Sequence, residues 1–442
     1  MTYEEALAYM EGLRRHGVKL GIERFAALLE RLGGPHLRYP VAHVAGTKGK
    51  GSTTAMIAAI VHEHGHSVGG YFSPYVYDVR ERVQVDGEMI APSDFADLVT
   101  RIAPHIAAVA SAGGGSTTEF ELKTAVGFLH FAERPVDAAA IEVGIGGRLD
   151  ATNVVRPSVS VITNIGLDHI HILGDTHAKI AAEKAGIVKP GVLTITAADE
   201  PSALAVIEST AAERRAPLIR VAAGPASAGD AGVVHWEAAG EGLAVHTPRG
   251  GYRELHPRLA GRCQFPNAAC AVAASEALLD ALSTPVSEEA VRRGLARAYL
   301  PGRIEIIRRK PTVLLDGAHN ELAARALAAE ILAIAHRRLH LVIGMVAGHG
   351  PECVVDALAP LATRVLATRP TWVRGQPAER IAEAALRHCT DVRIVTPPLD
   401  AALEALDGAA PDDLVVVTGS FYTVGDVPPR LLLAGRVPAT PR

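Results

Sequence analysis

A glycine-rich run, Gly46-Thr47-Lys48-Gly49-Lys50-Gly51-Ser52, is the clearest candidate for chemistry in this sequence. It follows an apolar segment at Val41–Val44 and precedes a helical pattern over Thr53–His64. In such a turn the backbone N–H groups face an anion, and the helix N-terminus adds partial positive charge. We therefore predict a phosphate-binding loop in which Lys50 reaches the β- and γ-phosphates of a nucleotide and Ser52 holds Mg²⁺.

The run matches the common nucleotide-binding pattern imperfectly. Val44 stands where that pattern has its first glycine, and Gly51 separates Lys50 from Ser52. The alternative is a glycine- and serine-rich loop with two surface lysines. The strand before the run and the helix after it favour the nucleotide, but they say nothing about the reaction.

The elements that must position this loop follow an α/β pattern. Short apolar runs alternate with longer helical patterns, which is typical of a mostly parallel sheet. Helices are expected at Asn267–Leu282, Glu321–His336 and Ala378–His388. The expected strands are Val41–Val44, Val68–Phe72, Ala138–Val143, Val159–Thr163, Val192–Thr196, Val313–Leu315, Leu339–Ile343, Val365–Ala367, Val392–Val395 and Leu414–Val417.

A break at Leu300-Pro301-Gly302 divides these elements into two series. With 442 residues the chain is also too long for one ordinary core. We expect two domains, residues 1–298 and 303–442. Alternating apolar and polar residues from Gly232 to Pro257 predict antiparallel hairpins appended to the first domain, and Ser111–Thr118 is expected to be a flexible linker or mobile loop.

Composition excludes several classes of protein. A net charge of −4 argues against a nucleic-acid-binding surface, which needs a clustered basic surplus. The 4 cysteines are scattered without a C-x-x-C pair, which suits a reducing compartment. No signal peptide or membrane span is expected. We therefore expect a cytoplasmic protein, and the absence of heptads makes a monomer the default.

Further segments resemble folylpolyglutamate synthases, a branch of the Mur ligase superfamily, in order over nearly the whole chain. The most specific are the twelve-residue block Glu142–Asn153 and the run Asp316–Asn320. The others are Gly21–Arg24, Gly46–Ser52, Ser73-Pro74 with Glu81-Arg82, Phe120–Thr124, Ile165–His169, Glu183–Ile187, Gln264–Ala269, Pro301–Arg303 and Gly419-Ser420.

This resemblance implies a fold and a reaction. The fold would be a mostly parallel P-loop-type ATPase domain with a small antiparallel addition, followed by a Rossmann-like domain. The reaction would be ATP-dependent ligation of L-glutamate to a folate, with dihydropteroate as the first acceptor, through an acyl phosphate. ATP and L-glutamate would be substrates together with dihydropteroate or tetrahydrofolate.

The resemblance also implies a metal site. Two Mg²⁺ ions are expected, and a monovalent cation is a further candidate. Lys184 would act as a carbamate, because an ammonium group with a pKa of about 10.4 cannot bind a cation; the alternative is a helix-surface lysine paired with a neighbour. His169 alone would more often be structural. The expected metal ligands are Ser52, Ser73, Glu142, His169 and Lys184.

The remaining site residues are expected on both domains. Lys50, Glu142, His169, Lys184 and Arg303 would form the catalytic set. The nucleotide contacts would be Gly49, Lys50, Gly51, Ser52, Asn267, Arg303, Asp316 and His319, although several of these could equally be caps or loop residues. The folate would contact Phe120, Thr124, Arg148 and Asp150, where Phe120 and Thr124 share a helix face and could equally be core.

Three departures from the family pattern leave the expected ATP and metal residues intact and leave the finer substrate preference open. Tyr75 and Cys263 each replace a histidine, and Ala347-Gly348-His349-Gly350 replaces an Asp-Lys-Asp run. The alternatives are a monofunctional folylpolyglutamate synthase or another Mur-type ligase, such as a peptidoglycan precursor enzyme. A nucleotide-binding regulatory protein is the alternative outside enzymes.

Overall fold

The computed structural model describes residues 1–17, 21–226, 232–240, 242–348 and 350–434. The chain divides into two compact units. Unit 1 comprises residues 1–75, 79–258 and 263–299, and unit 2 comprises residues 76–78, 259–262 and 300–442.

Unit 1 is built on an 11-stranded sheet in the order β11-β10-β9-β8-β7-β6-β1-β5-β2-β3-β4. The strands from β9 to β2 in this order are parallel, and both edges are antiparallel. The mostly parallel sheet predicted from the sequence is confirmed. The strands are β1 Val41–Ala45, β2 Val68–Tyr71, β3 Val83–Val85, β4 Glu88–Met89, β5 Ala138–Glu142, β6 Val159–Ile162, β7 Leu193–Thr196, β8 Leu218–Ala223, β9 Val233–Ala239, β10 Gly242–Thr247 and β11 Gly250–Leu255.

The central strands β1, β5 and β6 are buried along their whole length, because helices cover both faces of the sheet. On one face α3 (Lys50–Glu63) packs against α9 (Phe265–Ala281) and α10 (Glu288–Arg297). On the other face α7 (His177–Ala185) and α8 (Pro201–Glu213) share a core with Ala45 and Ile162. The short helix α6 (Ile170–Leu173) precedes α7.

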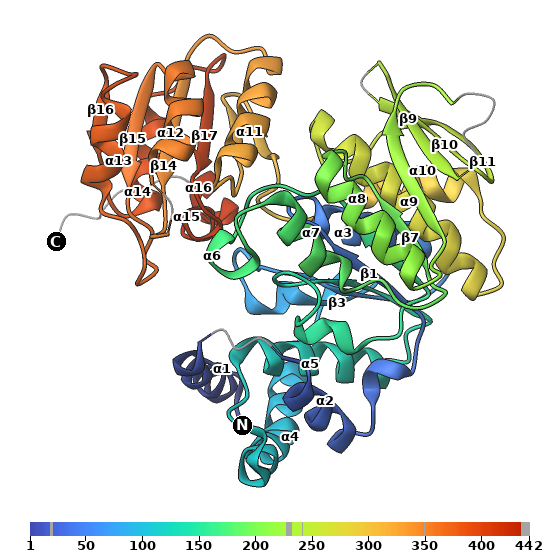
Figure 1. Cartoon of the computed structure of the whole chain (residues 1–442). Coiled ribbons are helices and arrows are strands. Elements are labelled where there is room, and N and C mark those ends of the chain that lie inside the picture. Colours follow the sequence, from blue (N-terminus) through green and yellow to red (C-terminus); the bar gives the residue numbers. More distant parts are fainter. Residues whose placement is uncertain (18–20, 227–231, 241, 349, 435–442) are drawn as a thin grey trace. The chain divides into compact units, whose positions relative to one another are not determined.

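A second group of helices belongs to unit 1. Figure 1 shows α1 (Tyr3–Gly12), α2 (Glu23–Arg31), α4 (Pro92–Val109) and α5 (Glu119–Glu133) together beside the sheet, and these helices share one apolar core with β5. A capping box fixes the start of α5: the Thr118 hydroxyl accepts from the Glu121 N–H, and the Glu121 carboxylate accepts from the Thr118 N–H at 2.7 Å.

Unit 2 has a six-stranded sheet in the order β12-β13-β17-β14-β15-β16, parallel except for its β12 edge. Helices α11, α12 and α13 share a core on one face, and α14 and α16 share a core on the other. This is the Rossmann-like arrangement that was expected. The elements are β12 Glu305–Arg309, β13 Thr312–Leu315, α11 Glu321–Ala333, β14 Leu339–Gly344, α12 Glu352–Leu358, β15 Arg364–Thr368, α13 Ala378–Ala385, β16 Val392–Ile394, α14 Pro398–Asp407, β17 Leu414–Thr418, α15 Phe421–Gly425 and α16 Pro429–Ala434.

The structure differs from the sequence prediction in the segment before α5. The linker expected at Ser111–Thr118 begins as a helical turn, because residues 110–114 continue α4 with widened π-type spacing. The antiparallel hairpins predicted between Gly232 and Pro257 are confirmed as β9–β11, and the parallel pairing of β8 with β9 joins them to the main sheet of unit 1. No helix in the described part of the chain is both long and apolar enough to span a membrane.

Candidate active site

The candidate site of unit 1 lies where four neighbouring parallel strands end. In the order β6-β1-β5-β2, the segments after these strands carry His169, the Gly46–Ser52 loop, Glu142 at the last position of β5, and Ser73. The carboxyl ends of parallel strands meet at one edge of a sheet, where α/β proteins place their ligands. Residues separated by more than 100 positions in the chain therefore converge on one edge.

The glycine loop is held by the segment that follows β6. The Thr47 N–H donates to the carbonyl of Asn164 at 2.9 Å, and the Thr47 hydroxyl exchanges hydrogen bonds with Gly166 at 2.9 and 3.1 Å. Gly46 has φ +149°, and a Cβ there would lie 1.9 Å from the Thr163 hydroxyl oxygen. The loop thus requires glycine at its first position because the β6 segment lies against it.

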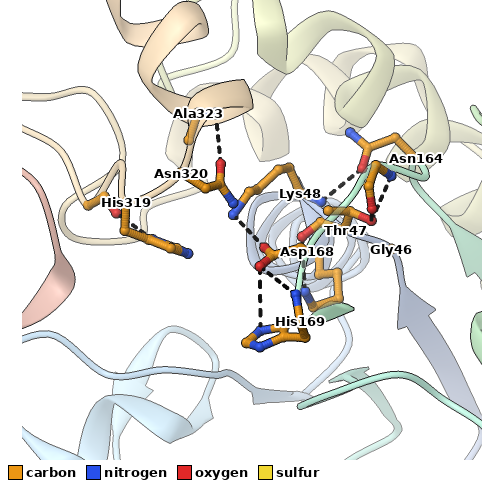
Figure 2. A network of polar contacts seen from close by, with 12 residues as sticks. Gly46, Thr47, Lys48, Asn164, Asp168, His169, His319, Asn320 and Ala323 are labelled. Carbon is orange, nitrogen blue, oxygen red and sulfur yellow. Dashed lines mark hydrogen bonds and ion pairs between the residues drawn. The ribbon is translucent and has the colours of Figure 1, made fainter. Parts of the chain in front are cut away.

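Two side chains that the sequence prediction did not assign complete this attachment. The Lys48 ammonium donates to the Asp168 carboxylate at 3.1 Å, and the Lys48 N–H donates to the Asn164 side-chain oxygen at 2.8 Å. Figure 2 shows Lys48, Asn164 and Asp168 gathered around the loop. In the sequence, Asp168 is marked only by its position in the block Ile165–His169, and that position does not indicate that Asp168 pairs with Lys48.

The first turn of α3 is open to an anion. Gly49 caps the helix in the left-handed region at φ +81° and has no side chain that could cover the first amides. Asn267, in the first turn of α9, lies against Gly49, because a Cβ at Gly49 would be 2.1 Å from the Asn267 side-chain oxygen. Lys50 extends back over the loop and donates to the Thr47 carbonyl at 3.4 Å. Gly51 and Ser52 are buried in the same turn.

Glu142 and Ser73 form a buried oxygen-rich pair. The Ser73 N–H donates to the Glu142 carboxylate at 2.7 Å, and Glu142 is only 2% exposed. The Ser73 hydroxyl oxygen is buried and has no hydrogen-bond partner among the described residues. A buried hydroxyl without a partner is costly unless something absent from the protein satisfies it. This pair therefore fits a hard cation such as Mg²⁺.

Lys184 lies on α7 with its side chain buried beneath the glycine loop. Its Nζ donates to the Gly46 carbonyl at 2.8 Å. Burial, followed by the nearby Lys50 charge, lowers the pKa of Lys184 to about 7. The alternative of a helix-surface lysine paired with Glu183 does not describe this environment, because Glu183 instead pairs with Arg148 at 2.8 Å.

His169 caps α6 in the left-handed region at φ +50°, beside Asp168. Its N–H donates to the Asp168 carboxylate at 2.9 Å, and its ring lies 4.0 Å from that carboxylate (Figure 2). Burial is the main cause that lowers the pKa of His169, which favours the neutral imidazole, the form that binds metals. The described residues contain no group of three or more His, Cys, Asp or Glu side chains placed to hold a metal.

The expected folate residues on α5 lie beside this edge of the sheet. The ring of Phe120 packs against Gly144, where a Cβ would approach it to 2.6 Å. Thr124 is fully buried, and its hydroxyl contacts the Phe120 carbonyl at 2.8 Å and the Tyr71 hydroxyl at 2.9 Å. These contacts favour packing for Thr124, whereas Phe120 is partly exposed.

Arg148 and Asp150 shape the loop after β5. The exposed Arg148 guanidinium pairs with Glu183 on α7. The Asp150 carboxylate accepts from the N–H groups of Ile145 and Thr152, both at 2.9 Å, and burial raises its pKa. The Asp150 carboxylate therefore caps backbone N–H groups of this loop.

Unit 2 places its three expected site residues around the end of β13. The Asp316 carboxylate accepts from the N–H groups of Ile304 at 2.9 Å and Ala318 at 2.8 Å. The guanidinium of Arg303 lies 3.8 Å from the centre of the Phe421 ring, and the His319 ring lies 6.1 Å from the same ring. Asn320 caps α11 through the Ala323 N–H at 3.0 Å (Figure 2).

The departures from the family pattern lie in different surroundings. Tyr75 is half-buried, and Cys263 is exposed, with a carbonyl that accepts from the Asn267 side chain at 3.2 Å. His349 lies outside the described residues. Gly348 and Gly350 line a cavity of about 390 Å³ in unit 2, beside Arg374 and Arg380.

Comparison with known proteins identifies the family. Residues 44–275 match the Mur ligase middle domain, and residues 302–421 match the glutamate ligase domain of Mur ligases. A dihydrofolate synthase/folylpolyglutamate synthase from Bacillus subtilis is 36% identical over 437 residues, which cover 97% of this chain and 99% of the relative. The Escherichia coli protein of the same description is 34% identical over 430 residues, covering 95% and 93%.

Solved structures agree with this result. E. coli FolC in complex with DHPP and ADP superimposes with a TM-score of 0.85 at 32% identity and covers 96% of each chain. The bifunctional synthase from Yersinia pestis complexed with AMPPNP and a Mn ion has a TM-score of 0.83 at 30% identity and covers 98% of each chain.

The fold and the site thus define an ATP-using acid–amino acid ligase, as the sequence resemblance predicted. This chain belongs to the dihydrofolate synthase/folylpolyglutamate synthase family of Mur ligases.

Proposed function

We propose that this chain ligates L-glutamate to folates at the expense of ATP and accepts both dihydropteroate and tetrahydrofolate. The observation that carries the proposal is the convergence of the Gly46–Ser52 loop, Ser73, Glu142, His169 and Lys184 at the carboxyl ends of β1, β2, β5 and β6. This edge offers phosphate-binding amides, cations and oxygen ligands together.

The reaction needs an activated carboxyl group, because a carboxylate oxygen is a poor leaving group. The acceptor carboxylate attacks the γ-phosphorus of ATP, which gives an acyl phosphate and releases ADP. The amine of glutamate then attacks the acyl carbon, and phosphate leaves as the amide forms. Catalysis of phosphoryl transfer depends mostly on positioning and charge neutralisation. The α3 amides and Lys50 would supply both at the phosphates.

Ser52, Ser73, Glu142 and His169 would hold the two Mg²⁺ ions. Mg²⁺ bound there would neutralise the charge on the phosphate oxygens. The buried Ser73 hydroxyl, which has no hydrogen-bond partner among the described residues, supports this assignment, and so does the lowered pKa of His169, which favours the neutral imidazole. A monovalent cation is a further ligand that the loop carbonyls could take.

Lys184 would become a ligand once its amine has reacted with CO₂, which forms a carbamate and releases a proton. The reaction requires a neutral amine, and burial provides one by lowering the pKa of Lys184 to about 7. The carbamate oxygens would extend beyond the Gly46 carbonyl, which Nζ already contacts at 2.8 Å.

The remaining nucleotide contacts are proposed in both units. In unit 1, Asn267 lies against Gly49 and could contact the nucleotide beside the loop. In unit 2, Arg303 would neutralise the γ-phosphate, Asp316 would accept the ribose hydroxyls, and His319 would contact adenine. The last three residues lie around the Phe421 ring and the end of β13, which supports a shared role.

The folate would lie along α5 and the loop after β5. Phe120 offers a partly exposed ring for stacking, and Arg148 offers an exposed guanidinium. Thr124 and Asp150 would act by holding Tyr71 and the loop in place, because their polar atoms are already bonded.

Phosphate release by the purified protein with ATP, Mg²⁺ and L-glutamate tests the proposal. We expect phosphate only when dihydropteroate or tetrahydrofolate is added, with a product heavier by one glutamyl residue in mass spectrometry. Turnover with tetrahydrofolate alone would reduce the assignment to a monofunctional synthase. Turnover with a muramyl peptide and neither pterin would overturn it.

A further inference from the structure

Unit 1 contains a group of cations that the proposed chemistry does not use. Lys123 on α5 donates to the Glu119 carboxylate at 2.7 Å, and Arg14 donates to the other oxygen of Glu119 at 3.2 Å. Arg82 lies close by, with its guanidinium 5.7 Å from the centre of the Phe120 ring. We call Arg82, Lys123 and Glu119 the α5 charge cluster.

The cluster has more positive than negative charge. Arg82 is 8% exposed and, among the described residues, forms no ion pair with a carboxylate. One of its N–H groups donates to the Phe72 carbonyl at 3.3 Å, but Nε is buried without a hydrogen-bond partner. Lys123 is 6% exposed, and the one carboxylate that it pairs with among the described residues, that of Glu119, is shared with Arg14. Burying an unbalanced guanidinium is costly, so an anion would stabilise this arrangement.

An aromatic ring covers both cations. The Tyr75 ring centre lies 5.6 Å from the Arg82 guanidinium and 5.5 Å from the Lys123 ammonium. Tyr75 follows Ser73 by two residues, and Phe120 packs against Gly144, two residues after Glu142. The cluster therefore adjoins the proposed metal ligands through both of its aromatic neighbours.

The two acceptors differ in the number of their carboxylates. Dihydropteroate has a single carboxylate, which is the one that reacts. A folate that already carries glutamate has the reacting γ-carboxylate and an α-carboxylate that must remain intact. While the γ-carboxylate faces the γ-phosphate of ATP, the α-carboxylate needs a cationic partner nearby. Arg82 and Lys123 offer a bidentate donor and an ammonium for this purpose.

We propose that Arg82 and Lys123 bind the unreacted α-carboxylate of the terminal glutamate of a folate acceptor. They are then specificity-determining residues for glutamate addition to a folate and contribute little with dihydropteroate. This inference rests on the proposed function, because it presupposes that both acceptors are used.

The first test compares KM values of the Lys123→Met variant with both acceptors. Methionine keeps the length of the side chain and removes the charge. We expect KM for tetrahydrofolate to rise at least about tenfold, the value of one charge-assisted hydrogen bond. KM for dihydropteroate should change less than about twofold, and Lys123→Arg should restore tetrahydrofolate binding. Arg14→Met is the matched control, because it also loses a Glu119 partner but leaves the inner cations in place.

The second test uses the wild-type protein and so does not depend on the folding of a variant. A tetrahydrofolate whose terminal α-carboxylate is converted to the carboxamide should show a KM at least about tenfold higher. An unchanged KM for the amide would overturn the inference. Equal losses with both acceptors in Lys123→Met, or a raised KM for L-glutamate in both reactions, would overturn it as well. Wild-type protein inactive with either acceptor would instead refute the proposed function, and the inference would fall with it.

Discussion

The two polar groups of Ser73 that face the site differ in their hydrogen bonding. Its hydroxyl is buried without a partner in the described part of the chain, while its N–H is bonded to the Glu142 carboxylate. If Ser73 had only a structural role, its replacement by alanine would cost no stability, since an unsatisfied buried polar group contributes nothing favourable to folding. We therefore propose that a bound ligand satisfies this hydroxyl.

The Ser73→Ala variant tests this explanation. Without Mg²⁺ its free energy of unfolding should remain within about 0.5 kcal/mol of the wild type, because no hydrogen bond is lost. The Mg²⁺ concentration for half-maximal activity should rise about tenfold. The control is Ser160→Ala, whose hydroxyl donates to the Ile187 carbonyl at 3.1 Å. It should lose about 1 kcal/mol of stability and keep its Mg²⁺ dependence. Equal destabilisation of both variants would contradict the assignment.

Lys184 permits a sharper experiment at the same scale. We expect Lys184→Ala to lower kcat about a hundredfold, which is typical of losing a group that orients a metal site, and acetate or another small carboxylate to restore part of it. Lys184→Arg should be equally slow, because a guanidinium forms no comparable carbamate. Steady-state kinetics measure both effects.

Lys179→Ala, on the same helix α7, is the control for Lys184 and should be fully active, because Lys179 pairs with Asp175 at the surface. Full activity of Lys184→Ala would show that the lysine is only packed beneath the loop.

At the scale of elements, the start of α3 depends on the backbone of Gly49. Alanine at this position would face both the left-handed conformation at φ +81° and a 2.1 Å approach to Asn267. Gly65 follows the other end of α3 at φ +90°, with no atom within 4 Å of an added Cβ. Alanine at Gly65 would therefore meet conformational strain alone, whereas alanine at Gly49 would meet both strain and crowding.

We expect Gly65→Ala to cost about 1 kcal/mol of stability without any effect on ATP binding. Gly49→Ala should cost more and raise the Kd for ATP at least about tenfold, because the first amides of α3 must shift. Chemical denaturation and nucleotide titration measure these effects. Unchanged ATP affinity in Gly49→Ala would mean that phosphate does not bind at this helix end.

A buried histidine on the central strand β1 should make the stability of the fold depend on pH. His43 is fully buried, and its Nε2 lies 2.9 Å from the Thr152 hydroxyl oxygen. Burial lowers the pKa of His43 from 6.5 to about 3. The unfolded chain therefore binds more protons than the folded chain below pH 6.5. The stability contributed by His43 is complete above that pH and declines as the pH falls from 6.5 towards 3.

Denaturation of His43→Gln at pH 7 and pH 5 measures this contribution. The variant should lose less stability than the wild type between these values, because glutamine does not titrate. His36 remains as a second contribution in both proteins, since burial lowers its pKa to about 4. An identical pH dependence of the two proteins would show that His43 is protonated in the folded state.

At the scale of the whole molecule, unit 2 includes two short segments that precede its main part in the chain. Residues 76–78 and 259–262 belong to unit 2, although the chain on either side of them belongs to unit 1. Val76 and Tyr77 pack against the core of unit 2 on the α14 face, and Ala260 packs on the opposite face. Unit 2 is therefore not complete when it begins at residue 300.

Gly425→Ala should weaken this attachment, because a Cβ there would lie 2.4 Å from the Val76 carbonyl oxygen. We expect a loss of about 1–3 kcal/mol, the usual cost of overpacking, in thermal or chemical denaturation. Gly408→Ala, also in unit 2, is the control, because its nearest neighbour is the flexible end of Arg364 at 3.3 Å. Equal stability of the two variants would mean that residues 76–78 are dispensable to unit 2.

The sequence by itself determined most of the helices and strands. Gly46–Ser52 lies between β1 and α3 as predicted, and each predicted strand is present within two residues. These predictions succeeded because periodicity, glycine and capping residues act over a few neighbouring positions. The strands β3, β4, β8 and β12 were missed: β3 and β4 are short, and β8 and β12 are only partly buried.

Only the tertiary structure decided which elements meet. It pairs Lys48 with Asp168 and Lys184 with Gly46, contacts that span 120 and 138 positions. It also places Arg82 beside Lys123, leaves the Ser73 hydroxyl without a partner among the residues that the structure describes, and joins the hairpins to the main sheet through β8 and β9. Strand order and burial depend on which apolar faces pack together across the whole chain, and no local pattern contains that information.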